Sequence, residues 1–361
     1  MSIRKHNFSA GPCTLPLEVL EEAQQEFVDY QGAGMSLIEM SHRGKHFDEV
    51  ANEAMRLSME VFEVPDDFSV LFLQGGAILQ FSMIPLNLIN PGQKAAYVNS
   101  GTWAKGAITD AQQYGDIYIA WDGSDSNFTR MPGSSELQMQ DNTRYLHITT
   151  NETIGGIRFP HWPDVDVQLV GDMSSEYMAR PIPWEKFDII YGGAQKNLGP
   201  AGMTVVFIRK SILHSCNQNM GRYLRYDIHE SKGSMFNTPP VFPIYMFGKV
   251  LKWMKKEGGL AAMESKASDK AGLLYNTIDD SNGYYNCPVD VDCRSHMNVV
   301  FRLQTEELEQ KFLAEAGNAD FLNLNGHRSV GGCRASIYNA LPKSSVEALC
   351  QFMGEFRASN G

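Results

Sequence analysis

The sequence predicts an α/β protein, in which a large domain with a mostly parallel sheet flanked by helices precedes a smaller α+β domain. Three observations favour this architecture. The chain has 361 residues, 43% hydrophobic and 20% charged, which is too long for one small core and ordinary for a globular protein. Short apolar runs alternate with helical patterns as far as residue 208. After Pro243 a long helical segment replaces this alternation. We assign residues 16–256 to the large domain and 257–361 to the small domain, with 1–15 packing against the latter.

Two helices are expected before the sheet. Thr14 and Pro16 indicate the start of the first, because threonine caps helices and proline is tolerated in their first turn. Its apolar positions keep roughly helical spacing: Leu17, Leu20, Phe27 and Val28. The second helix, between Phe47 and Phe62, repeats apolar residues at the spacing of one helix face, and Pro65 lies beyond its end.

The middle of the chain alternates between strands and helices, which is typical of a parallel sheet covered on both faces. The predicted strands cover 69–73, 95–99, 117–121, 145–149, 168–171, 189–191 and 203–208, and the helices 78–88 and 103–114. From Pro243 a helical segment reaches residue 256, breaks at two glycines and resumes to 274. Strands at 298–303, 321–324 and 332–337 and helices at 305–316, capped by Thr305, and 343–356 complete the tail.

Charge and composition exclude several function classes. The net charge of −11 and the absence of a Lys/Arg block argue against nucleic acid or an anionic membrane as partner. Residues 1–7 lack the apolar core of a signal peptide, and no apolar run approaches the length of a membrane span. Six scattered cysteines without a C-x-x-C pair indicate reduced thiols, so we expect a cytoplasmic protein, and we predict no metal site.

The segment around Lys196 carries the strongest chemical signal. A buried strand at 189–191 leads into Gly192-Gly193-Ala194-Gln195-Lys196, and a second apolar run follows at 203–208. Burial lowers the pKa of a lysine, and an uncharged amine is the nucleophile that forms Schiff bases. The pattern therefore indicates a lysine that binds pyridoxal phosphate. The alternative is a loop lysine whose amine reaches solvent.

Four further features would serve such a cofactor. Gly75 and Gly76 stand between a strand and a helix, where backbone N–H groups bind phosphate, although a plain turn has the same pattern. Trp103 begins a helix and offers an indole for stacking, or else packs in the core. Asp172 ends a strand and would keep a pyridine nitrogen protonated, or else caps a turn. Thr153 also follows a strand and offers a hydroxyl to the ring. Their order along the chain is typical of fold-type I pyridoxal phosphate enzymes.

Seven segments along nearly the whole chain resemble those of the phosphoserine aminotransferases, which belong to the class V aminotransferases. They are FSAGP (8–12), SHRG (41–44), NET (151–153), GAQKN (193–197), GSMFNTPP (233–240), GHR (326–328) and RASIYN (334–339). The resemblance implies a homodimer with active sites at the subunit interface. The implied reaction converts 3-phosphohydroxypyruvate and glutamate into O-phosphoserine and 2-oxoglutarate, in serine biosynthesis. Use of a phosphorylated precursor of vitamin B6 stays open.

The resemblance also implies roles for individual residues. Lys196 matches the Schiff-base lysine that moves the proton, and Asp172 matches the partner of the pyridine nitrogen. Trp103 matches the stacking ring and Thr153 the hydroxyl contact. The phosphate-binding positions match Ala77, Ile78 and Gln195, together with Asn237 and Thr238 from the neighbouring subunit. The substrate-binding positions match Ser9, His42, Arg43, His327, Arg328 and Arg334.

The sequence departs from the family pattern at one point, and two classes of rival function remain. Some relatives carry an arginine after the glycine pair, where this chain has Ala77-Ile78-Leu79, so one candidate for the distal anion is missing. The nearest rivals are other class V enzymes, such as an alanine–glyoxylate aminotransferase or a cysteine desulfurase. A desulfurase needs a reactive cysteine, whereas Cys333 leads straight into a strand. A nucleotide-binding regulatory protein would use Gly75 and Gly76 but would lack G-x-G-x-x-G spacing and leave Lys196 unexplained.

Overall fold

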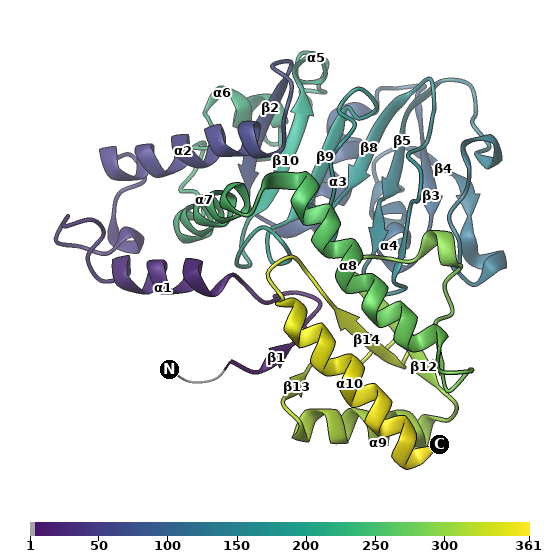
Figure 1. Cartoon of the computed structure of the whole chain (residues 1–361). Helices are drawn as coiled ribbons and strands as arrows, with labels where there is room; N and C mark the ends of the chain where they lie inside the picture. Colours follow the sequence, from purple (N-terminus) through teal and green to yellow (C-terminus); the bar gives the residue numbers. More distant parts are fainter. Residues whose placement is uncertain (1–3) are drawn as a thin grey trace.

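The computed structural model describes residues 4–361, so residues 1–3 of the predicted N-terminal segment lie outside it. A seven-stranded sheet forms the larger part of the molecule (Figure 1). Its order is β2 (Phe68–Leu73), β10 (Thr204–Arg209), β9 (Ile189–Gly193), β8 (Gln168–Asp172), β5 (Thr143–Thr149), β3 (Lys94–Asn99) and β4 (Asp116–Asp122). Only β10 runs against its neighbours. The predicted mostly parallel sheet is confirmed.

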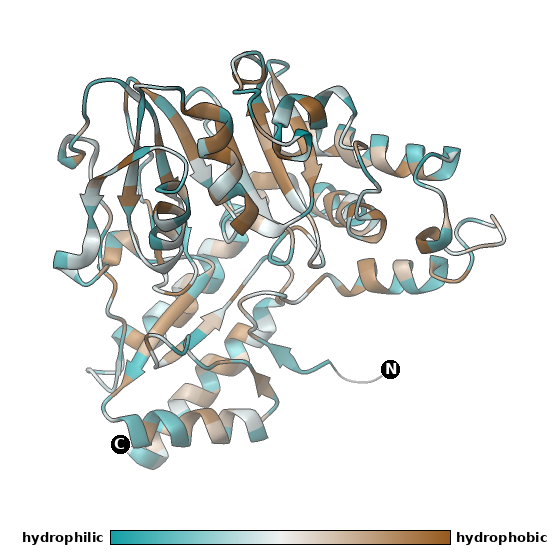
Figure 2. Ribbon diagram, turned by 180° about the vertical axis from the view of Figure 1, so that it is seen from behind, coloured by the Kyte–Doolittle hydropathy of each residue, from teal (hydrophilic) through white to brown (hydrophobic). Residues whose placement is uncertain are grey.

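The two faces of the sheet bury alternate residues of each strand, as a two-residue period requires. On one face, side chains such as Val170 and Ile189 pack against α3 (Gly76–Leu88) and α4 (Thr102–Ala111). On the other, side chains such as Leu169 and Ile190 join the cluster that contains α2 (Lys45–Val61) and α7 (Val241–Lys256). Figure 2 shows hydrophobic stretches along strands of the sheet, whereas several of the outer helices mix hydrophobic and hydrophilic residues. The sheet therefore belongs to two continuous cores.

This topology gathers several chain segments at one edge of the sheet. Six of the seven strands run in the same direction, so their carboxyl ends lie together. Helix α3 starts three residues after β2 and α4 starts three residues after β3, which places both helix N-termini at that edge. Ligands of open α/β sheets bind at such an edge.

The remainder of the chain forms a smaller unit below the sheet, with α8 (Gly259–Asp279) running between the two (Figure 1). Its three-stranded antiparallel sheet contains β11 (Tyr285–Asn286), β12 (Asn298–Leu303) and β14 (Cys333–Ser336). Helices α9 (Glu306–Asn318) and α10 (Lys343–Asn360) pack with this sheet in one cluster. The Thr305 side chain accepts a hydrogen bond from Leu308 N, which confirms the predicted cap of α9.

The N-terminal segment pairs with this smaller unit through β1 (His6–Asn7), which lies parallel to β13 (Phe321–Leu322). The exact domain boundary between residues 256 and 257 stays a prediction. Helices α5 (Lys210–Leu213) and α6 (Tyr226–Ser231) complete the larger unit. Within residues 4–361, no helix combines the length and apolar character that crossing a membrane requires.

The prediction for the first helix is partly wrong. Helix α1 (Leu17–Glu26) begins after Pro16, and the Thr14 hydroxyl donates to Asn7 O instead of capping the helix. The residues of the predicted apolar stripe are 36–80% exposed, and the last two of them lie beyond the end of the helix: Leu17, Leu20, Phe27 and Val28. The buried positions of the helix are Val19 and Ala23. The predicted stripe therefore does not face the core.

Candidate active site

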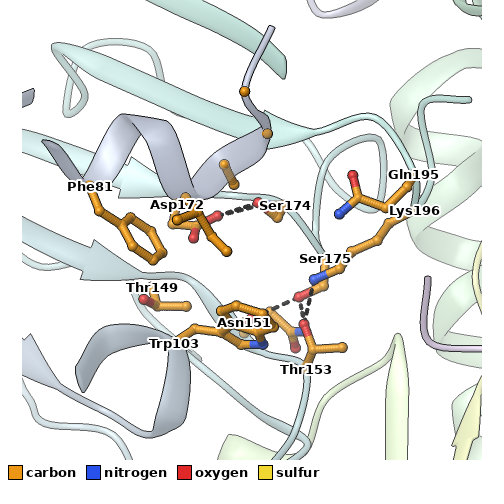
Figure 3. Close-up of a pocket in the computed structure, with 14 residues that line it drawn as sticks. Phe81, Trp103, Thr149, Asn151, Thr153, Asp172, Ser174, Ser175, Gln195 and Lys196 are labelled. Carbon is orange, nitrogen blue, oxygen red and sulfur yellow. Dashed lines mark hydrogen bonds between the residues drawn. The ribbon is translucent and has the colours of Figure 1, made fainter. Parts of the chain in front are cut away.

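The glycine pair after β2 forms the N-terminus of α3. Gly75 and Gly76 both have a positive φ, of 90° and 69°. A Cβ on Gly75 would lie 2.4 Å from Leu79 Cδ2, so only glycine fits this close turn. The N–H groups of the first turn have no partner inside the helix, and the helix dipole favours an anion beside them. Together with the predicted residues Ala77 and Ile78, the two glycines line a cavity at the carboxyl edge of the sheet (Figure 3).

Lys196 enters the same cavity from the loop between β9 and β10 (Figure 3). Its side chain is 7% exposed, and Nζ donates a hydrogen bond of 2.6 Å to the Thr153 hydroxyl. Burial lowers the pKa of the Lys196 amine to about 8, although the nearby carboxylates of Asp172 and Glu152 act in the opposite direction. The lysine is therefore a buried amine with a lowered pKa, and it is not a loop lysine whose amine reaches solvent.

Asp172 lies at the carboxyl end of β8, on the face of the sheet covered by α3 and α4, and lines the cavity. Ser174 donates to its Oδ1 twice, from the backbone N at 2.9 Å and from the hydroxyl at 2.6 Å. These bonds fix the carboxylate and leave Oδ2 available to a ligand. Burial raises the pKa of Asp172, whereas the Ser174 hydrogen bonds and the Lys196 charge lower it. A cationic N–H placed against Oδ2 would therefore gain a fixed and poorly solvated counterion.

The cavity wall also contains buried polar atoms that have no hydrogen-bond partner among residues 4–361. They include Trp103 Nε1 and Thr149 Oγ1. Leaving such a group unpaired costs about 1–3 kcal/mol, so a bound ligand that pairs with it would be stabilised. The amine of Lys196 lies 5.8 Å from the centre of the Trp103 ring. An aromatic wall, an N–H acceptor, a buried amine and a phosphate-binding helix end together fit pyridoxal phosphate.

The structure brings together every cofactor residue that was predicted to come from one chain. Gln195 lines the cavity beside Lys196, and Thr153 holds the lysine. Further lining residues were not singled out from the sequence: Phe81, Thr149, Asn151, Ser174 and Ser175. Of these, Thr149 and Ser174 carry a recognisable signal, since one ends a strand and the other follows Asp172 by two residues.

The predicted substrate residues are more dispersed. Arg334 lies beside the cavity, where its guanidinium donates to Thr153 O at 3.2 Å. His327 is near Arg334, and burial together with the charges of Arg334 and Arg328 lowers the pKa of its imidazole. The Ser9 hydroxyl donates to Asn7 Oδ1 at 2.6 Å. None of these four residues lines the cavity as the described chain forms it.

Four other predicted residues also lie outside the cavity wall. His42 and Arg43 lie in the turn before α2, on the segment that follows α1. Asn237 and Thr238 precede α7, and Thr238 O accepts a hydrogen bond of 2.8 Å from the side chain of Gln74, next to the glycine pair. The roles predicted for these side chains are therefore not explained by a single copy of the chain.

The lowered pKa of Lys196 predicts how the attachment of pyridoxal phosphate to the apoprotein depends on pH. Only the uncharged amine attacks an aldehyde, so the rate should rise roughly tenfold from pH 7 to 9 and then level off. Stopped-flow absorbance measures this, and a free alkylamine treated in parallel corrects for titration of the cofactor itself. In Asp172→Asn the midpoint should fall, because the carboxylate that favours the ammonium form is gone. A rate that still climbs steadily to pH 10 would contradict this prediction.

Comparisons with known proteins agree with this geometry. The family described as aminotransferase class-V matches residues 5–349. The phosphoserine aminotransferase of Laribacter hongkongensis is 50% identical over 356 residues, which covers 99% of each chain. That of Niallia circulans is 49% identical over the full length of both chains. The solved phosphoserine aminotransferase from Bacillus circulans subsp. alkalophilus is 49% identical, with a TM-score of 0.98 over 100% of both chains. A pyridoxal phosphate-bound phosphoserine aminotransferase from Trichomonas vaginalis is 39% identical, with a TM-score of 0.93 over 97% of this chain and 100% of that one.

Proposed function

Because this chain belongs to the class-V aminotransferase family, we propose that it acts as a phosphoserine aminotransferase with Lys196 at the centre of its active site. The reaction transfers the amino group of glutamate to 3-phosphohydroxypyruvate and yields O-phosphoserine and 2-oxoglutarate. The observation that carries this proposal is the Lys196 amine, buried in a cavity with Asp172, Trp103 and the glycine pair. Use of a phosphorylated vitamin B6 precursor stays a prediction.

Pyridoxal phosphate, when bound, supplies an electron sink for the bond that breaks at the substrate Cα. In our proposal Lys196 Nζ would hold the cofactor and would carry the proton that leaves the substrate Cα. Asp172 would keep the pyridine nitrogen protonated through the oxygen that Ser174 leaves available. The N-terminus of α3 would bind the phosphate, and Trp103 would hold the ring in place.

The rival functions fit the residues less well. A cysteine desulfurase needs an accessible thiol, but Cys333 is 1% exposed and packed in the small-unit core, where burial raises the pKa of its thiol. An alanine–glyoxylate aminotransferase acts on small substrates and would not need the additional cationic residues His42, Arg43, His327 and Arg328.

We also propose a cytoplasmic location for this protein. All six cysteines are free thiols, which supports this proposal.

Substrate preference tests this function directly. Arg334 should bind the α-carboxylate common to all amino acids, whereas Arg43 and Arg328 should bind the distal anion that serine lacks. A charged hydrogen bond contributes about 1.5–3 kcal/mol, so two contacts imply at least a ~10²-fold preference in kcat/KM for phosphoserine over serine. Arg334→Ala should impair every substrate, Arg43→Ala should impair phosphoserine and glutamate alike, and Arg328→Ala should impair phosphoserine more than glutamate. The exposed Arg56, paired with Glu60, provides a control, Arg56→Ala, that should change none of these values. Equal kcat/KM for phosphoserine and alanine would overturn the assignment.

We also propose that two copies of the chain form a homodimer and share each active site. The segment from α1 to α2 exposes a group of large apolar side chains: Leu17, Phe27, Val28, Met35 and Ile38. His42 and Arg43 follow this apolar group directly and do not line the cavity of their own chain. A second copy that covers the apolar group would bring these cations, together with Asn237 and Thr238, toward the neighbouring cavity.

Complementation of two inactive chains tests the shared site. Lys196→Ala and Thr238→Trp should each be inactive alone, the second because a bulky indole blocks the neighbouring cavity. In a mixed dimer, one site combines an intact Lys196 with an intact Thr238 from the other chain. Random pairing should therefore restore about a quarter of the parent activity on co-expression. Mixed dimers that form but stay inactive would place Thr238 in the site of its own chain.

A further inference from the structure

The carboxylate of Glu152 has no direct part in the proposed reaction. It lies next to the cofactor site, in contact with the backbone of Trp103. Glu152 belongs to β6 (Asn151–Glu152), which pairs with β7 (Ile157–Arg158), and its side chain is 0% exposed. Its Oε1 accepts a hydrogen bond of 2.8 Å from Ala104 N, and its Oε2 accepts one of 3.2 Å from Trp103 N. These are the second and third N–H groups of α4, which have no partner inside the helix.

The carboxylate takes the place of an ordinary helix cap. The N-cap residue of α4 is Gly101, which has no side chain with which to bind these N–H groups. Its φ of 155° and ψ of −157° belong to a region that only glycine adopts readily. A Cβ at this position would lie 2.9 Å from Glu152 Cδ, so glycine also provides the space for the carboxylate. Burial raises the pKa of Glu152 to about 7, whereas the two N–H groups lower it, and the helix dipole also favours the anionic form.

This one carboxylate connects two residues of the cofactor site that come from different elements. Trp103 is bound through its backbone at the start of α4, while Thr153 follows Glu152 directly in the chain. Thr153 in turn accepts the hydrogen bond of Lys196, and the Lys196 amine lies 5.8 Å from the Trp103 ring centre. A shift of Glu152 therefore changes the position of the indole and of the hydroxyl relative to the amine.

We infer that Glu152 is a positioning residue, which holds Trp103 and Thr153 in the geometry that orients pyridoxal phosphate at Lys196. The inference rests on the proposed function only through its cofactor and is independent of which amino acid is the substrate. Glu152→Gln keeps the size of the side chain but offers one acceptor oxygen for two N–H groups. Its amide N–H₂ would then face a backbone donor.

The test compares parent and variant holoenzymes by the induced circular dichroism of the bound cofactor in its visible band. We expect Glu152→Gln to reduce this band by at least about half, to raise the cofactor Kd at least ~10-fold, and to lower kcat at saturating cofactor at least ~10-fold. Glu152→Asp, which keeps the charge on a shorter side chain, should restore part of the band. These spectral readouts need no substrate, so they stay interpretable even if the proposed substrate is wrong.

Glu309→Gln is the matched control. Glu309 is also a buried glutamate, 4% exposed, whose Oε1 accepts a hydrogen bond from the backbone N of Leu303 in the small unit, away from the cofactor cavity. Its substitution should lower the unfolding temperature without changing the dichroism band or the cofactor Kd. Should Glu152→Gln behave in the same way, with lower stability but an unchanged band, the positioning role is overturned. If Glu152→Gln does not fold, Glu152→Asp replaces it in the test: a reduced band supports the positioning role, and an unchanged band overturns it.

Discussion

Lys196→Ala should lower turnover by at least ~10³-fold, because the nucleophile and the proton carrier are lost together. The amine is buried and hydrogen-bonded to Thr153, and no other lysine lines the cavity formed by residues 4–361. The protein should still fold and should bind pyridoxal phosphate more weakly, since the residues proposed to hold its phosphate and ring are unchanged. Steady-state transamination of phosphoserine with 2-oxoglutarate measures the loss.

The control for this variant is Lys270, a buried lysine that lies away from the cavity. Lys270 is 3% exposed, donates to the carbonyl oxygens of Tyr338 and Leu341, and has its pKa lowered by burial to about 7. Lys270→Met removes a buried amine without touching the cavity and should keep the visible absorbance of the attached cofactor. Near-parental activity of Lys196→Ala would remove Lys196 from the centre of the mechanism.

Asp172→Asn should lower kcat by roughly 10²-fold or more while KM changes little. Asparagine has nearly the same shape, but it lacks the negative charge that keeps the pyridine nitrogen protonated, so the electron sink weakens in the transition state. The Ser174 hydrogen bonds to Oδ1 should persist, so the cofactor should stay bound. Parallel measurement of kcat, KM and cofactor Kd separates the two roles. If the variant changes only the cofactor affinity, Asp172 binds the cofactor but does not strengthen its electron sink.

Much of the fold follows from local patterns, because buried strands and the helices between them have strong periodicity. The alternation up to β10 was predicted with nearly correct bounds. The break between α7 and α8 was predicted from two adjacent glycines, and Gly258 does take a positive φ of 102° at the start of α8. The failure at α1 has a physical cause. Spacing predicts an apolar face but does not reveal what covers it, and here that face is directed away from the core of its own chain.

The site was predictable where a residue's position in a strand determines its surroundings. Asp172 ends β8 and Lys196 follows β9, and both strands end at the same sheet edge, so the proximity of the two side chains could be inferred from the order of the elements. Glu152 carries no comparable signal, because its partners Trp103 and Ala104 come from a helix 48–49 residues earlier in the chain. Likewise, the pattern of a single sequence does not reveal which substrate-binding residues reach the active site of a second copy of the chain.

Peptide mapping of the borohydride-reduced holoenzyme tests the central claim most directly. Reduction makes the bond between the cofactor and its lysine permanent, so digestion and mass spectrometry identify the attached residue. The structure predicts that the cofactor mass is found on the peptide containing Lys196, and that the visible absorbance disappears with reduction. Attachment to Lys270, or to no lysine at all, would contradict the central role of Lys196.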